Sequence, residues 1–168
     1  MKVLLALVVL AAVVFAFIPA AASASDKSVY RAYVSRDSDF AKLGSDLGRT
    51  LRRWERSGHK RQSPVLKVLR RGHQLIGELT TVVKAEAPSS ANGKRGKKYA
   101  LATLVYLDRS FSALAKDVRA RTAGRLAAAK DYMAKSRDLD SRAGKAEKRA
   151  RKYFKAAGVP IKPDPASP

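Results

Sequence analysis

The stretch "SPVLKVLRRGHQLIGELTTVV" (residues 63–83) indicates the fold most clearly. Its apolar positions recur every three or four residues: Val65, Leu69, Gly72 or His73, Ile76, Leu79 and Val83. This spacing places them on one face of an α-helix. Ser63 followed by Pro64 is a typical helix start, with Ser as N-cap and Pro at the first helical position. The stretch therefore predicts an amphipathic helix that is closed by Pro88.

The same helical period appears on both sides of this stretch. An earlier helix is predicted from Val29 to "SGHKRQS" (residues 57–63), where Gly58 would end it. Its apolar positions are Val29, Tyr33, Phe40, Leu43, Leu47, Leu51 and Trp54. The stretch "APSSANGKRGKK" (residues 87–98) predicts a loop rich in Gly, Ser and Lys. A last helical region begins near Lys97 or Lys98 and stops at Gly158. Its apolar positions are Leu101, Leu104, Val105, Phe111, Leu114, Val118, Leu126, Ala129, Tyr132, Met133, Leu139, Tyr153 and Phe154.

The fold class follows from this periodicity. No strand-like alternation occurs, so the sequence predicts an all-α protein: a three- or four-helix bundle or helical hairpin with a long C-terminal helix. Residues 97–157 could form one helix or two. One continuous helix would extend roughly 90 Å and protrude from the bundle. A break near residues 121–124, or at "RDLDS" (residues 137–141), would give a compact four-helix arrangement.

The N-terminal residues predict export. "MK" precedes an apolar run at residues 3–18, and Ala22-Ser23-Ala24 matches the small-x-small pattern of secretory cleavage sites. We expect a signal peptide over residues 1–24, cleaved after Ala24, and a secreted, periplasmic or cell-envelope protein. The alternative is an uncleaved N-terminal membrane anchor, for which the run is shorter than the roughly 20 residues of a spanning helix.

The remainder is predicted to contain a single basic helical domain over residues 25–158. A Pro-rich tail over residues 159–168 is predicted to be disordered. The sequence contains no cysteine, so the domain depends on packing without disulfides.

Charge is the strongest feature of the composition. The sequence contains 35 Lys and Arg against 14 Asp and Glu, a net charge of +21. A field of this size attracts polyanions at long range. Three segments concentrate the cations, and the candidate anion-contacting residues are Arg49, Arg52, Arg53, Arg56, Lys94, Arg95, Lys97, Lys98, Arg142, Lys145, Lys148, Arg149, Arg151, Lys152 and Lys155.

Two of these segments resemble specific binding motifs. "RTLRRWERSGHKR" (residues 49–61) interleaves cations with Trp54, as nucleic-acid-binding surfaces do. On a helix, however, Trp54 falls on the apolar stripe and the arginines on the opposite face, so Trp54 is predicted to be a core residue. "NGKRGKK" (residues 92–98) suits an anion at a helix start, but it lacks the spacing of a P-loop. We expect a flexible, solvated loop there.

Motifs for catalysis or metal binding are not evident. His59 and His73 have no partner at helical spacing, and a haem held by His73 and Met133 is a much weaker interpretation than packing. The sequence lacks the G-x-S-x-G motif, and its acid pairs stand two apart, which directs them away from each other on a helix. Asp108 occupies an apolar stripe position, so we expect it to be partly buried and paired with an Arg or Lys of a neighbouring helix. These patterns predict no enzyme activity, no cofactor, no metal and no small-molecule substrate.

The combined prediction is an exported, non-enzymatic helical protein that associates electrostatically with an anionic partner of the cell envelope. Wall polymers, lipid headgroups and acidic proteins are all candidates. Because the apolar face of residues 142–155 consists mainly of alanines, deep membrane insertion is not expected. Two alternatives stay open. One is a nucleic-acid-binding protein, which export disfavours, and the other is an enzyme or cofactor carrier without a recognisable motif.

Overall fold

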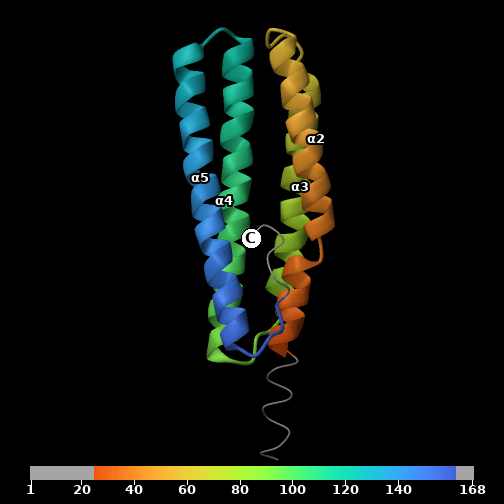
Figure 1. Ribbon diagram of the computed structural model, residues 1–168, viewed down its shortest axis with the longest axis vertical. Coiled ribbons are helices and arrows are strands. Elements are labelled where there is room, and N and C mark those ends of the chain that lie inside the picture. Colours follow the sequence, from red (N-terminus) through yellow and green to blue (C-terminus); the bar gives the residue numbers. More distant parts are fainter. Residues whose placement is uncertain (1–24, 162–168) are drawn as a thin grey trace, which may run out of the picture.

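The computed structural model describes residues 25–161, and within this range the chain contains helices and no strand, which confirms the all-α prediction. Residues 25–34 are helical and precede four longer helices. These are α2 (Asp37–Arg56), α3 (Ser63–Ala85), α4 (Ala91–Thr122) and α5 (Leu126–Ala156). The helices alternate in direction: the α2–α3 and α4–α5 connections lie at one end of the bundle, and the α3–α4 connection lies at the other (Figure 1).

The first predicted helix is divided in two. A single helix from Val29 onward is wrong, because a turn at Ser35 and Arg36 separates residues 25–34 from α2. The hydroxyl of Ser35 donates to the Ala32 carbonyl at 2.7 Å, and the Arg36 carbonyl accepts the first hydrogen bond of the new helix from Phe40 at 3.0 Å. A short polar side chain that bonds to the backbone in this way competes with continuation of the helix. The turn therefore ends the first helical segment and starts α2 as a separate helix.

The start of α3 differs from the prediction by one position. Gln62 occupies the N-cap position, so Ser63 and Pro64 form the first helical turn. Pro fits there because the first N–H groups of a helix have no partner within the helix. The other end of α3 is held by α4: the ammonium of Lys97 donates to the Lys84 and Glu86 carbonyls at 2.7 and 2.6 Å. Carbonyls at the end of a helix require such partners.

The predicted loop over residues 92–98 is wrong, because α4 already begins at Ala91. The hydroxyl of Ser90 caps this helix by accepting from the Gly93 N–H at 2.8 Å. The glycines that suggested a loop allow close packing within a helix. A Cβ at Gly93 would lie 1.9 Å from Oδ1 of the buried Asp26, and one at Gly96 would lie 2.9 Å from the Phe154 ring.

The last helical region forms two helices. α4 ends at Thr122, and Gly124 adopts a left-handed conformation with φ of 70°. The Arg125 N–H donates to the Ala120 carbonyl at 2.8 Å, which completes a conventional helix C-terminus. α5 then runs back along α4 (Figure 1). The last region is therefore two helices, broken near residues 121–124, which was one of the two break positions considered, and α5 packs along α4 instead of protruding.

The helices α4 and α5 pack along each other, and most of their buried side chains are small. Among them are Ala100, Thr103, Ser110, Ala113, Ala120, Ala129, Ser136, Ala143, Ala146 and Ala150. Small side chains allow two helix backbones to approach closely. Near the middle of the seam between α4 and α5, the hydroxyls of Ser110 and Ser136 lie 2.9 Å apart, and each lies 3.3 Å from the other residue's carbonyl oxygen, so each proton has two acceptors within reach. Both polar groups are thus satisfied inside the protein.

Larger apolar residues form two clusters. One surrounds residues 25–34 and includes Val29, Tyr33, Ile76, Leu79, Val83, Leu104 and Phe154. The other lies toward the α2–α3 turn and includes Trp54, Val65, Leu69, Leu114 and Val118. Trp54 is only 4% exposed, which confirms its prediction as a core residue. Val105 is 45% exposed, so its assignment to the apolar stripe of the last region is wrong.

The start of the predicted tail belongs to the folded domain. Val159 is buried in the cluster around residues 25–34, and Ile161 packs against that cluster, so disorder is wrong for residues 159–161. Residues 162–168 and the predicted signal peptide lie outside the described residues. Among the helices of residues 25–161, none has the length and hydropathy to cross a membrane.

Candidate anion-binding face of the α4–α5 hairpin

The arginines of α2 form a separate exposed group. Arg49, Arg52, Arg53 and Arg56 are all exposed, and Arg49 pairs with Asp46 at 2.8 Å. The nearby Trp54 is buried and meets the His59 ring edge-on, with ring centroids 4.5 Å apart. Because no open indole face accompanies these arginines, this segment is an ordinary amphipathic helix with a basic outer side.

The other two groups of candidate cations are brought together by the fold. Because α4 and α5 are antiparallel, the first turns of α4 lie beside the last turns of α5, where the Asn92 amide donates to the Ala156 carbonyl at 3.3 Å. Most of these cations are exposed: Lys94, Arg95, Lys98, Lys145, Lys148, Arg149, Lys152 and Lys155. Two are engaged inside the protein: Lys97 binds the end of α3, and Arg151 pairs with Glu147 at 3.0 Å.

Two tyrosines join this group, and their role was not predicted. Tyr99 and Tyr153 stack with ring centroids 5.5 Å apart and planes inclined by 2°. Arg95 lies over Tyr153 at 5.7 Å, and Arg149 lies over Tyr99 at 5.5 Å. Each helix contributes one arginine and one tyrosine at i, i+4, which are neighbours on a helix surface. The repeated R-x-x-x-Y spacing, at residues 95–99 and 149–153, could have indicated this stack before the structure was known.

The same side of the hairpin remains basic toward its other end. In α4, Arg109 and Lys116 follow Arg95 at multiples of seven residues, and in α5, Lys135 and Arg142 precede Arg149 by the same step. Residues seven apart lie on nearly the same side of a helix. We call this surface the basic face, and its cations are Arg95, Lys98, Arg109, Lys116, Lys135, Arg142, Lys145, Arg149 and Lys152. It extends for about 30 Å at 1.5 Å per residue.

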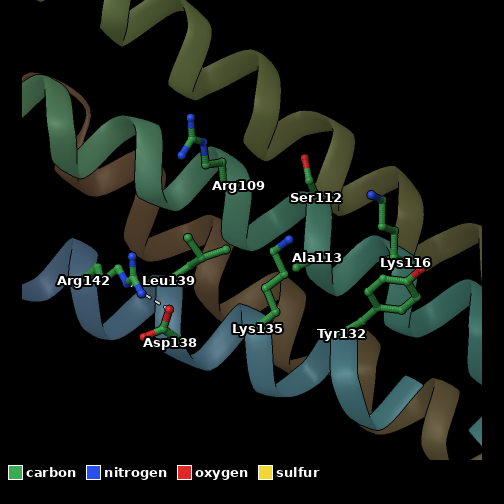
Figure 2. Close-up of a pocket in the computed structure, with 9 residues that line it drawn as sticks. All are labelled: Arg109, Ser112, Ala113, Lys116, Tyr132, Lys135, Asp138, Leu139 and Arg142. Atoms are coloured by element: carbon green, nitrogen blue, oxygen red, sulfur yellow. Dashed lines mark ion pairs between the residues drawn. The ribbon is translucent and has the colours of Figure 1, made fainter. Parts of the chain in front are cut away.

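A groove of about 510 Å³ lies within the basic face, between α4 and α5 (Figure 2). Its lining residues are Arg109, Ser112, Ala113, Lys116, Tyr132, Lys135, Asp138, Leu139 and Arg142. Ala113 and Leu139 are buried and provide an apolar floor. Lys135 extends from α5 toward α4, and Arg142 pairs with Asp138 at 2.9 Å (Figure 2). The ammonium of Lys116 lies 5.9 Å from the centre of the Tyr132 ring.

Only Arg142 of this groove was among the predicted anion-contacting residues. The immediate sequence neighbours of Arg109, Lys116 and Lys135 are neutral or acidic, so none of the three lies in a dense run of cations. A search for dense basic segments therefore misses them. Their convergence depends on the register of two antiparallel helices, which the periodicity of each helix alone does not specify.

Asp108 has a different partner from the one expected. Its Oδ1 lies 2.6 Å from Nδ1 of His73 and accepts a hydrogen bond when that nitrogen carries the proton, where an Arg or Lys partner was predicted. His73 also meets Phe111 edge-on, with ring centroids 6.2 Å apart. Met133 packs against the cluster around Trp54. Within residues 25–161, no group of three His, Cys, Asp or Glu side chains converges to hold a metal ion.

These features describe a basic, grooved face on one hairpin of a helical bundle. Comparison with known proteins adds no relative: no family model matches this chain, and neither a curated protein nor a solved structure is significantly similar to it.

Proposed function

We propose that this is an exported, non-enzymatic protein whose basic face binds an anionic partner of the cell envelope. The supporting observation is that cations from distant parts of the sequence gather on one side of the α4–α5 hairpin. A strip about 30 Å long suits an extended polyanion, because successive charges along the ligand can each meet a cation of the strip. Export is inferred from the predicted signal peptide alone.

The packing of α5 favours a surface interaction over insertion into a bilayer. Its alanines at positions 143, 146 and 150 are buried against α4, so they are not free to face lipid. A helix that lies in a membrane interface needs an apolar face directed at the acyl chains. We therefore favour an extended anionic wall polymer over lipid headgroups.

The stacked tyrosines argue against single-stranded nucleic acid as the partner. Proteins of that class present open aromatic faces on which bases stack. Here Tyr99 and Tyr153 stack on each other, and each ring also has a guanidinium over it. A base could stack on either ring only if the other tyrosine or the arginine over that ring moved away. The basic face retains the general attraction for phosphate groups, so duplex binding stays the alternative.

The test compares two variants of equal charge. The face variant replaces Lys98, Lys145 and Lys152 with Gln, and the control replaces Arg52, Arg56 and Lys60 with Gln. All six residues are exposed. Cosedimentation with wall and membrane fractions of the host is measured at about 50 mM and about 500 mM salt, since screening shortens the Debye length over this range.

We expect the wild type and the control to bind at low salt and to dissociate at high salt, and the face variant to bind weakly at both. Equal loss in the two variants would show that total charge, rather than the basic face, determines binding. The absence of any envelope binding would refute the proposal. Tighter binding to duplex DNA than to heparin, with a steep salt dependence, would favour the nucleic-acid alternative.

A further inference from the structure

The groove between α4 and α5 differs from the rest of the basic face in its shape and lining. It is a concave space of about 510 Å³, within the 300–1,000 Å³ range of typical small-ligand sites. The cations of the groove are exposed like those elsewhere on the face, so only the shape and the other lining residues distinguish it. A concave site can surround one chemical unit of a ligand, so it offers selectivity that a charged strip does not.

The charges that line the groove suit a phosphate group. Arg109, Lys116 and Lys135 and the Arg142–Asp138 pair give the lining a clear excess of positive charge. A phosphodiester carries one negative charge, as a carboxylate does, so the surplus positive charge would be matched by successive phosphates of a polymer rather than by one group. Guanidinium groups bind phosphate with two parallel hydrogen bonds, and lysine ammonium groups add point charges. When the ligand binds, the Arg142 guanidinium would donate to the phosphate and give up part of its ion pair with Asp138.

The remaining lining suits a small hydroxylated body attached to the phosphate. Ala113 and Leu139 offer an apolar floor, and the Tyr132 ring forms part of the wall. Ser112 adds a hydroxyl group that can donate or accept a hydrogen bond. The volume is several times that of one phosphate ion. A sugar or polyol that carries a phosphate would use both the cations and the apolar floor, whereas inorganic phosphate would use only the cations.

We infer that the groove binds one phosphorylated polyol or sugar unit of an extended anionic polymer. The inference rests on the proposed function and gives it a substrate class. The cations beside the groove, toward the first turns of α4 and the last turns of α5, would hold the neighbouring units: Arg149 lies one heptad, a rise of about 10 Å, from Arg142 of the groove. Glycerol-phosphate headgroups of lipids share this chemistry, but a flat bilayer does not bring a headgroup to a floor recessed between two helices.

The experiment uses the chain expressed from residue 25 and a soluble glycerol-phosphate oligomer joined by phosphodiesters. Polyglutamate of similar length is the carboxylate probe, and vesicles rich in phosphatidylglycerol are the lipid probe. The groove variant is R109Q/K135Q, and the control with the same charge loss is R52Q/R56Q. Affinity is measured by titration calorimetry at a fixed low salt, and circular dichroism verifies that all variants fold.

We expect the groove variant to bind the oligomer about tenfold more weakly than the wild type, since it lacks two charge-assisted contacts, and the control to change by less than about twofold. Polyglutamate binding should weaken similarly in both variants. Equal losses of oligomer binding would overturn the groove site but leave the proposed function intact. Wild-type preference for polyglutamate, or a groove effect seen with vesicles alone, would also overturn it. Failure of the wild type to bind any of the three probes would reject the proposed function itself.

Discussion

The packing of Asp26 against Gly93 leads to a sharp prediction for Gly93→Ala. A Cβ at this position would lie 1.9 Å from Asp26 Oδ1, so the carboxylate must move. Asp26 is fully buried and accepts the N–H groups of Ser89 and Ser90 at 2.9 and 3.3 Å. Hydrogen bonds to charged groups contribute about 1.5–3 kcal/mol each, and we take about 3 kcal/mol for this pair because the second bond is long.

Alanine offsets part of this loss, because it is favoured over glycine inside a helix by about 1 kcal/mol. The net expectation for Gly93→Ala is a decrease of about 2 kcal/mol in the free energy of unfolding. The matched control is Gly144→Ala in α5, where a Cβ meets no atom within 4 Å. There the substitution changes only the helix propensity, so we expect the free energy of unfolding to rise by about 0.5–1 kcal/mol.

The assay is urea denaturation followed by circular dichroism at 222 nm, with the wild type and both variants measured together. The same substitution should change stability in opposite directions at the two positions. If Gly93→Ala were as stabilising as Gly144→Ala, the first turn of α4 would not pack against Asp26. Residues 92–98 would then be the solvated loop that their composition suggests.

Three further predictions concern buried or engaged polar groups. Ser110→Ala or Ser136→Ala alone should each lower the free energy of unfolding by about 1 kcal/mol, and the double variant should lose less than the sum, because each single variant already removes the contact between the two hydroxyls. Burial raises the pKa of Tyr33, despite an opposing hydrogen bond from Thr103. Since the unfolded state ionises first, stability should be fully present below about pH 10 and should decline above it. Tyr33→Phe should flatten this decline in urea titrations between about pH 8 and pH 11; an unchanged slope would contradict the assignment. Lys97→Met should cost about 1 kcal/mol of stability, because two carbonyls at the end of α3 lose their donor. It should leave heparin affinity within about twofold, and a large drop in affinity would show that Lys97 is instead free to bind anions.

Several features of the fold could be predicted from local patterns. The stripe from Val65 to Val83 places α3 correctly, and Gly58 and Gly158 follow helix ends as predicted, because both adopt positive φ. Trp54 is buried as its helical position requires. These predictions succeed because they depend on spacing within one helix or on the conformation of one residue.

The errors have a common physical origin in contacts between distant segments. Gly93 and Gly96 resemble loop residues, yet they are required where Asp26 and Phe154 approach α4. Val159 lies beyond the last helix but fills the core around residues 25–34. A tertiary contact of this kind has no local pattern in the sequence. The turn at Ser35 was missed because serine is tolerated within helices as well as at their ends.

The sequence by itself determined the helical class, the amphipathic division of each helix and the large positive charge, because all three depend on residue type and spacing. Only the tertiary structure decided which cations share a surface. Arg109 and Lys135 lie far apart in the sequence and line one groove because α4 and α5 are antiparallel and in a particular register. That register depends on the fit of the small side chains along the seam, including the Ser110–Ser136 pair, and such a fit exists only once the two helices pack together.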